Sequence, residues 1–468
     1  MLLSVPFPSP LTGLSLAEAA GYVATGTGGP TDTSGQRGFG TSSWVTAVGL
    51  RGRSPDRQLL AVDGVYPTLD SVADGSYALS AEVRLIVRSG PRGLLGLPGK
   101  LGPVRRWLWP DEEGTLALAA WFGGPESRAA FYGQPFEVSL AAAGDVMLSR
   151  NVGKAIDENG LEWPFGLVGE RLGEADVTYC NLESPLGTSG EPLPGKGIWF
   201  RASPKTVTCL TGAGIDVVSL ANNHILDYDS PCLLETIDIL DSHGIAHAGA
   251  GEDMAAARAP AIVEVPVRTG LLDPRAPAGD GVFRVAFLSY TEFAKPDLFW
   301  DVTYRRTFLA GEGVPGCAPL DMSMVAEDVP AALEVADFVV VCYHWGMENE
   351  PYPLRYDPKN DLDSIARRTI DLGAGLVLGT HPHAVQGLEV YRGGVIAYSL
   401  GNFVMDQKRD TQKEGLVLEV RLGPTGVLSA RLLPVWIDTT RPRFLEGDEA
   451  KGLLEKVEVI SRPFRGGP

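Results

Sequence analysis

The 468-residue chain lacks several features that would assign it to a class at once. No apolar run approaches the roughly 18 residues that a membrane-spanning helix needs. The five cysteines are odd in number, scattered and without a CxxC pair, so we expect core or loop cysteines rather than a disulfide framework. No basic residue precedes Arg37, which argues against a signal peptide. Either the protein is cytosolic or a leader lies outside this reading frame.

Basic residues are also scarce. The 40 lysines and arginines stand against 58 aspartates and glutamates, which gives a net charge of −18. Proteins that bind polyanions usually carry a basic excess, so general nucleic-acid binding is not expected. A local anionic ligand stays open, because a bound metal can invert the charge of a site. With 44% hydrophobic residues the chain is globular, and its length predicts two or three domains.

The pattern along the chain changes near residue 135. Over residues 1–134, Gly-rich stretches separate a strand predicted at 78–87 from helices predicted at 117–122 and 127–132. From Phe136 onward, short apolar runs alternate with helical stretches, and the end is rich in strands. This alternation predicts an α/β domain whose sheet gains antiparallel strands. We therefore expect one domain over residues 1–134 and a second over 135–468.

Polar side chains follow five apolar strands in the second domain. They are Asp145; Asn181 and Glu183; Asn223 and His224; His344; and His381 and His383. Taken singly, each is more often a cap, a turn residue or a hydrogen-bonded structural residue. Because ligands of open α/β sheets bind outside the carboxyl ends of the strands, we expect these five ends to converge on one crevice.

The polar set contains carboxylates, amides and imidazoles but no thiolate. It suits Mn, Fe or Zn in a hydrolytic site better than it suits a structural zinc. The chain has only six histidines, and four of them lie at these strand ends. The remaining two flank the end of a predicted helix.

Six segments, in chain order, resemble the poly-γ-glutamate capsule-synthesis (CapA-like) family, a branch of the calcineurin-like metallophosphoesterases. They are GDVMLSR (144–150), NLESPLG (181–187), SLANNHILDYD (219–229), YHWGMENE (343–350), GTHPHAVQGLEVY (379–391) and YSLGNFVMDQ (398–407). The resemblance covers about residues 136–440. It implies a four-layer α/β/β/α sandwich, here preceded by a smaller α/β lobe, with two divalent metal ions at the strand ends.

The resemblance also implies roles for individual residues. The metal ligands would be Asp145, Glu183 as the bridging carboxylate, Asn223, His344, His381 and His383, with Asn181 and Glu348 in support. His224 would contact substrate phosphate as the catalytic residue, oriented by Asp227. For Asp227 and Glu348, a solvated loop charge is an equal alternative. Relatives in the wider superfamily carry histidine where this chain has Met147, so one metal site is expected to have fewer protein ligands.

The implied function is metal-dependent hydrolysis, most simply of a phosphoester, with two cations about 3.5–4 Å apart that activate water. The alternatives are a non-catalytic role in the assembly or export of an anionic surface polymer such as poly-γ-glutamate, and an anion-binding module. Expected partners are an anionic small-molecule or polymer substrate and membrane proteins of capsule synthesis. The resemblance implies an extracytoplasmic or membrane-associated location, although the chain itself shows no signal peptide or transmembrane segment.

A weaker resemblance links residues 10–135 to the second lobe of phosphate-type periplasmic solute-binding proteins. It rests on GLSLAEAAGYVATG (13–26), VDGVYPTLDSVADGSYALSAEVRLIVR (62–88) and AAWFGGPESRAAFYGQP (119–135). Such proteins grip an oxyanion between two lobes, whereas about one lobe is present here. We expect a structural lobe, with an anion site as the alternative, and we expect Met1 to lie inside a domain.

Overall fold

A computed structural model describes residues 136–466 except 270–278, 295–306, 356–359 and 425, and before them only six short strands. Of these, β1 (Ser4–Pro6) pairs with β3 (Arg57–Leu59), and β2 (Gly13–Leu14) pairs with β4 (Ala61–Val62). Apart from these strands, the predicted solute-binding lobe lies outside the described residues, as do its boundary at residue 134, the predicted strand at 78–87 and the helix predicted at 127–132. The helix expected at 117–122 is wrong at its start, because β6 (Leu116–Leu118) pairs with a longer strand, β21 (Gly426–Asp438).

The larger sheet has ten strands in the described chain, and its central strands run in the order β10-β9-β8-β7-β20-β21. Besides β6 and β21, whose bounds are given above, the sheet consists of β5 (Trp109–Pro110), β7 (Val138–Val146), β8 (Val177–Leu182), β9 (Val217–Ser219), β10 (Ala246–Ala248), β19 (Asn402–Val404), β20 (Glu414–Gly423) and β22 (Arg441–Phe444). Strands β7 to β10 are parallel, whereas β20 pairs antiparallel with both β7 and β21. The prediction that a parallel sheet gains antiparallel strands is confirmed.

The second sheet has six strands in the order β12-β13-β15-β16-β18-β17. They are β12 (Ala261–Thr269), β13 (Gly279–Thr291), β15 (Phe338–His344), β16 (Leu376–Thr380), β17 (Leu388–Tyr391) and β18 (Gly394–Ala397). Strands β13, β15, β16 and β18 are parallel. Every residue of β15 is buried, as its continuous apolar sequence FVVVCY predicts for a strand covered on both faces. A separate short pair joins β11 (Ala250–Gly251) and β14 (Gly316–Cys317).

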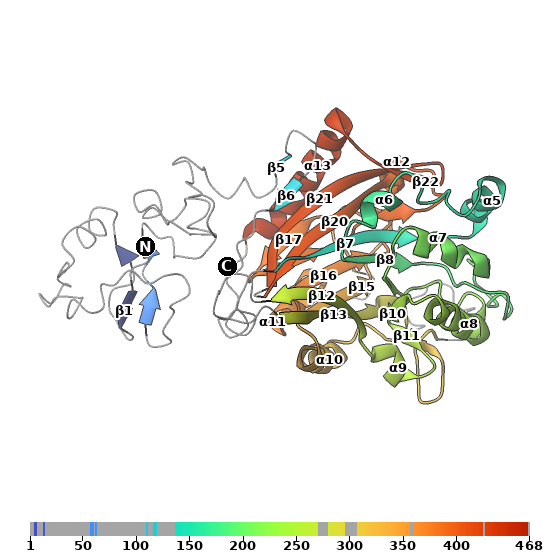
Figure 1. Cartoon of the computed structure of the whole chain (residues 1–468), viewed down its shortest axis with the longest axis horizontal. Helices are drawn as coiled ribbons and strands as arrows, with labels where there is room; N and C mark the ends of the chain where they lie inside the picture. The colour runs from blue at the N-terminus through green and yellow to red at the C-terminus, as the bar shows by residue number, and fades with distance from the viewer. Residues whose placement is uncertain are drawn as a thin grey trace, which may run out of the picture.

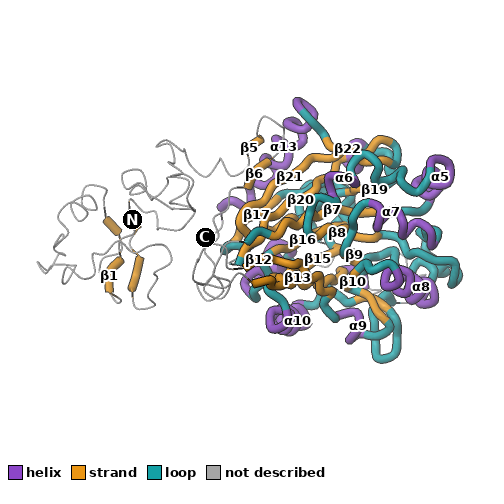
Figure 2. The backbone as a smooth tube through the Cα atoms, in the orientation of Figure 1, coloured by secondary structure: helices purple, strands orange, loops and turns teal. Residues whose placement is uncertain are grey.

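Helices cover the outer face of each sheet (Figures 1 and 2). The larger sheet carries α5 (Arg150–Asn159), α6 (Gly169–Leu172), α7 (Val207–Gly212) and α8 (Asp229–Ser242); the smaller carries α9 (Met254–Arg258), α10 (Met322–Val335) and α11 (Leu362–Asp371). Helix α12 (Asp410–Lys413) follows β19, and α13 (Gly447–Ser461) packs against β21 and β17. Short 3₁₀ turns are η1 (Pro204–Thr206), η2 (Glu292–Ala294) and η4 (Arg462–Gly466).

Three hydrophobic clusters hold these layers together. One lies between the two sheets and includes Leu140, Val285 and Leu418. The other two lie between a sheet and its helices. Adjacent residues of β7 alternate between clusters, because successive side chains of a strand point to opposite faces: Leu140 joins the inter-sheet core, and Ala141 joins the helix side. The predicted four-layer α/β/β/α sandwich is confirmed.

All five cysteines are free and buried, as expected for core residues. Within the described part of the chain, no helix is long and apolar enough to cross a membrane.

Candidate metal centre

The polar residues at the strand ends meet at one edge of the molecule, between the two sheets. Asp145 is the second-to-last residue of β7, Asn181 lies in β8, and Glu183 immediately follows that strand. Asn223 and His224 follow β9, His344 ends β15, and His381 and His383 follow β16. All but Asn223 are buried. The larger sheet therefore supplies the carboxylates and the smaller sheet supplies three imidazoles.

Two overlapping groups of side chains could each hold a cation. Glu183, His344 and His381 form one group, and Asp145, Glu183 and His383 form the other, with ligand atoms within 4.8 Å of one another. Glu183 belongs to both. Its two carboxylate oxygens are buried and have no hydrogen-bond partner among the residues that the structure describes. Burying a carboxylate without donors is costly, so the arrangement fits cations that would satisfy both oxygens.

Burial sets the charge state of this centre. Desolvation and the neighbouring Asp145 raise the pKa of Glu183 well above its usual range. Burial alone would lower the pKa of His383, but the attraction of Glu183 and Asp145 outweighs it and raises that pKa to about 10. Burial also lowers the pKa of His344 and His381 well below the ordinary histidine value. These two rings are therefore neutral near pH 7, the form in which imidazole binds a metal.

His344 is the most connected ring of the centre. Its Nε2 lies 3.0 Å from Asn223 Oδ1 and 3.1 Å from His381 Nδ1. The Asn181 Nδ2 lies 3.4 Å from the other ring nitrogen, Nδ1, of His344. It also donates a hydrogen bond to Asp145 Oδ1 at 2.7 Å, which orients the aspartate. The backbone adds a constraint, because His381 and His383 have φ values of 94° and 52°, in the left-handed region that non-glycine residues avoid. Such strain persists only where the surroundings enforce it.

His224 also lies near Glu183, with its Nε2 4.0 Å from Glu183 Oε1. Its Nδ1 is 2.7 Å from Asp227 Oδ2, and Asp227 is fully buried, so the solvated-loop alternative for Asp227 is wrong. Burial, reinforced by Lys196, lowers the pKa of His224 to about 4. Glu348 is exposed, yet its charge raises the pKa of both Glu183 and His383, so it lies near the rim of the centre.

The sequence model of the family described as "Bacterial capsule synthesis protein PGA_cap" matches residues 139–407. The chain belongs to this family. The capsule biosynthesis protein CapA of Bacillus anthracis is 27% identical over 338 residues, which cover 70% of this chain and 74% of that protein. The PGA biosynthesis protein CapA of Bacillus subtilis is 27% identical over 315 residues, covering 67% and 75%. The resemblance inferred from the six motifs is confirmed.

Among solved structures, the calcineurin-like phosphoesterase YfkN from Bacillus subtilis is 12% identical, with a TM-score of 0.38. The match covers 70% of this chain and 99% of that one.

The PGA_cap region contains site residues that the sequence reasoning missed. The buried Lys196 contacts the Asp227 carboxylate and the Asn223 carbonyl, and its Nζ lies 3.3 Å from His224 Nδ1. Phe200 stacks on the His224 ring, with ring centroids 3.8 Å apart. Asn402 Oδ1 lies 2.8 Å from His383 Nδ1. Lys196 and Phe200 occur in an irregular Gly- and Pro-rich segment, so only their closeness in sequence to NLESPLG could have drawn attention to them.

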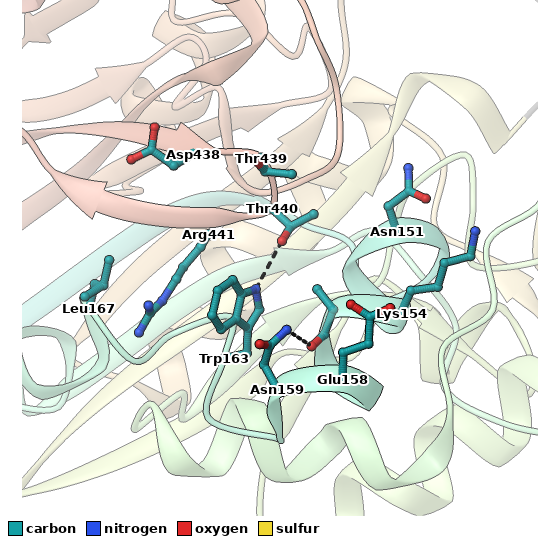
Figure 3. Close-up of a pocket in the computed structure, with 11 residues that line it drawn as sticks. Asn151, Lys154, Glu158, Asn159, Trp163, Leu167, Asp438, Thr439, Thr440 and Arg441 are labelled. Carbon is teal, nitrogen blue, oxygen red and sulfur yellow. Dashed lines mark hydrogen bonds between the residues drawn. The ribbon is translucent and has the colours of Figure 1, made fainter.

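A separate pocket of about 640 Å³ lies beside α5 (Figure 3). None of the predicted metal or catalytic residues lines it.

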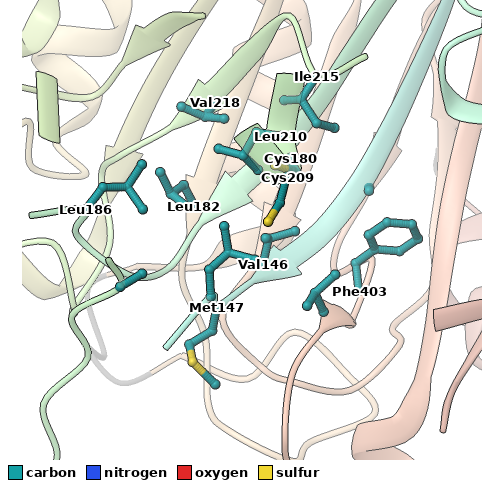
Figure 4. Close-up of a cluster of buried hydrophobic side chains, with 14 of the residues drawn as sticks. Val146, Met147, Cys180, Leu182, Leu186, Cys209, Leu210, Ile215, Val218 and Phe403 are labelled. Carbon is teal, nitrogen blue, oxygen red and sulfur yellow. The ribbon is translucent and has the colours of Figure 1, made fainter. Parts of the chain in front are cut away.

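Met147 belongs to the core of the PGA_cap region. Its side chain is fully buried in the cluster between the larger sheet and its helices, where Val146 and Leu182 also lie (Figure 4). Its sulfur accepts a hydrogen bond from the Ser149 backbone nitrogen at 3.2 Å. In the described chain, neither of the two groups of side chains that could hold a cation includes Met147.

Proposed function

We propose that this PGA_cap protein is a metal-dependent hydrolase, a phosphoesterase, that acts on an anionic substrate in capsule or poly-γ-glutamate synthesis. One observation carries the proposal: the buried Glu183 carboxylate has no donor in the described chain and is shared by two groups of metal-capable side chains. Family membership supports the biological context. The proposal includes a location outside the cytoplasm and membrane partners of capsule synthesis.

Six residues would hold two divalent ions of Mn, Fe or Zn: Asp145, Glu183, Asn223, His344, His381 and His383. Their carboxylate, amide and imidazole groups suit these metals, and the neutral rings of His344 and His381 already present lone pairs. The ions would supply Lewis-acid polarisation of a phosphoryl oxygen and neutralise its charge. Asn181, through its hydrogen bond to Asp145, would keep that ligand in place.

His224 would act directly on the substrate. Its Nδ1–H donates to Asp227, which fixes the ring and leaves Nε2 on the side of Glu183. The low pKa keeps the ring neutral in the free protein. An arriving phosphate anion favours the protonated ring, because an opposite charge raises a histidine pKa. Nε2 would then hold a proton for the leaving oxygen while Asp227 stabilises the imidazolium.

Metal content and phosphoester hydrolysis test the proposal together. The chain is equilibrated with Mn²⁺, its metal content is measured by elemental analysis, and hydrolysis of p-nitrophenyl phosphate and bis-p-nitrophenyl phosphate is followed. We expect about two ions per chain and metal-dependent turnover. His381→Ala should lose both, whereas the control His243→Ala, which changes an exposed residue that immediately follows α8, should lose neither.

Three outcomes would contradict the proposal or part of it. Full metal occupancy in His381→Ala would show that the ligand assignment is wrong. A single bound ion in the wild type would rule out the two-metal form. Two ions without hydrolysis of either ester would favour a non-catalytic role in assembly or export of an anionic surface polymer.

A further inference from the structure

Arg150, the last residue of the GDVMLSR motif, is held at the rim of the candidate centre. It begins α5, separated by three residues from the end of the strand that carries Asp145, and it adopts a left-handed φ of 52°. Its Nε lies 3.3 Å from the buried carboxylate of Asp406, while 42% of its side chain is exposed. Asp406 also accepts a hydrogen bond from the Asn151 backbone nitrogen at 3.3 Å. The Asp406 carboxylate thus lies beside the Nε of the guanidinium.

The ring of Phe200 connects Arg150 to the catalytic side of the centre. The Arg150 Cζ lies 5.4 Å from the centroid of Phe200, and the His224 ring stacks on the same phenyl ring. The Nη1 and Nη2 groups of Arg150 make no hydrogen bond to any residue that the structure describes. Together they form the planar fork that binds a carboxylate or phosphate through two hydrogen bonds.

A pocket lies along one face of α5, and its lining begins at Asn151, the residue after Arg150. Asn151, Lys154, Ala155 and Glu158 lie at helical spacings of three and four residues and line the pocket of about 640 Å³ (Figure 3). The opposite wall contains Trp163 and Arg441, whose guanidinium lies 4.7 Å from the indole centroid. Neither Lys154 nor Arg441 forms an ion pair within the described chain. Of the two acidic wall residues, Asp438 is paired with Arg443 at 3.0 Å, whereas Glu158 forms no ion pair within the described chain.

We propose that Arg150 binds a second acidic group of the substrate, and that the rest of an extended acidic chain lies along α5 in this pocket. The inference rests on the proposed function, since that function places the first acidic group at the metal centre. It assigns the substrate to a class that carries at least two acidic groups.

Binding measurements on the Mn²⁺-equilibrated full chain test this without catalysis. Calorimetry at low salt compares a glutamate pentapeptide, 1,6-hexanebisphosphonate and inorganic phosphate. The variant is Arg150→Gln, whose amide can still pair with Asp406. We expect about a tenfold loss of affinity for at least one of the two extended probes and less than a twofold change for phosphate. The extended probe that loses affinity identifies the acidic group as a carboxylate or a phosphate.

Arg284→Gln is the matched control, because Arg284 is 44% exposed and also pairs with one carboxylate, at 2.8 Å. It should leave all three affinities unchanged. Lys154→Gln should weaken the pentapeptide about threefold if the chain lies along α5; an unchanged affinity would overturn that path.

Two further results would overturn the role of Arg150. One is that wild type and Arg150→Gln bind both extended probes alike. The other is that Arg150→Gln loses phosphate and the extended probes equally, since Arg150 would then act at the metal centre. Absence of phosphoester hydrolysis would count against the proposed function alone, because these affinities do not depend on turnover.

Discussion

Two buried carboxylates of this protein, Glu183 and Glu389, have very different surroundings. Glu389 accepts hydrogen bonds from Arg367 Nε at 2.9 Å and from the Tyr398 hydroxyl at 2.8 Å. Glu183 has no hydrogen-bond donor among the side chains and backbone that the structure describes. A buried carboxylate that accepts hydrogen bonds stabilises a fold, whereas one that accepts none is typical of a functional site.

At this scale we predict opposite effects of two matching substitutions. Glu183→Gln should abolish Mn²⁺ binding and change the metal-free free energy of unfolding by less than about 1 kcal/mol, because no hydrogen bond to Glu183 is lost in the described chain and His383 keeps Asp145 as a carboxylate partner. Glu389→Gln should keep the metal and lose about 2 kcal/mol, because Arg367 loses its charged partner. Elemental analysis and urea unfolding in chelator measure both effects. Equal destabilisation by the two substitutions would mean that Glu183 is structural.

The pH dependence of metal binding also belongs to single residues. The pKa of His383 is raised to about 10, so the metal-free protein holds a proton on this ring at pH 7. A metal needs the unprotonated ring, so binding must release that proton and affinity must rise with pH. Between pH 6 and 9 we expect the Mn²⁺ affinity to rise about tenfold per pH unit for each proton that is released on binding. Calorimetry in buffers of different ionisation enthalpy counts the protons; equal affinity at pH 6 and 8 would contradict the expectation.

At the scale of elements, the centre depends on a close approach of backbones. A Cβ at Gly144 would lie 1.9 Å from the Gly401 carbonyl oxygen, which accepts a hydrogen bond from the Asp145 nitrogen at 3.0 Å. The pairing of β7 with β8 also shifts register between Ala142 and Asp145, a bulge that turns the end of the strand.

Gly144→Ala should therefore lower the free energy of unfolding by about 3 kcal/mol or more and remove metal binding, since β7 and the Gly401 segment must separate. Gly452 provides the contrast, because it lies inside α13 and, apart from the backbone of its own helix and its chain neighbours, nothing lies within 4 Å of an added Cβ. Gly452→Ala should stabilise the protein by about 0.5–1 kcal/mol through helix propensity. Thermal and urea unfolding measure the pair, and a stable, metal-binding Gly144→Ala variant would contradict the close-approach argument.

At the scale of the whole molecule, the candidate ligands come from both sheets. Asp145 and Glu183 belong to the larger sheet, and His344, His381 and His383 belong to the smaller one. Metal would therefore join two layers that otherwise meet through the inter-sheet hydrophobic cluster. Because ligand binding to the folded state alone stabilises that state, metal content should control global stability.

Mn²⁺ at about 100 times its dissociation constant should add about 2.7 kcal/mol per site and raise Tm by about 5 °C or more. Chelator should reverse the rise. Glu183→Gln is the internal control and should show no metal-dependent shift. A Tm that is the same with Mn²⁺ and with chelator would indicate that the centre holds no metal.

The sequence by itself determined the order of the elements and the list of candidate site residues. Strands β7, β8, β15 and β16 and the polar residues after them could be predicted because apolar runs and residue types are local properties of the chain. The helix predicted at 117–122 was wrong at its start because strand pairing with β21 depends on a distant segment.

Only the tertiary structure decided how these residues act together. The His381 nitrogen donates to Asp145 Oδ2 at 3.2 Å across 236 residues, and no local pattern encodes that contact. The absence of donors around Glu183 in the described chain depends on the packing of both sheets, and the burial of Asp227 and its contact with Lys196 depend on two separate loops of the larger sheet that pack together. Residue type shows which side chains can bind a metal, but the packing of separate layers determines which of them share one.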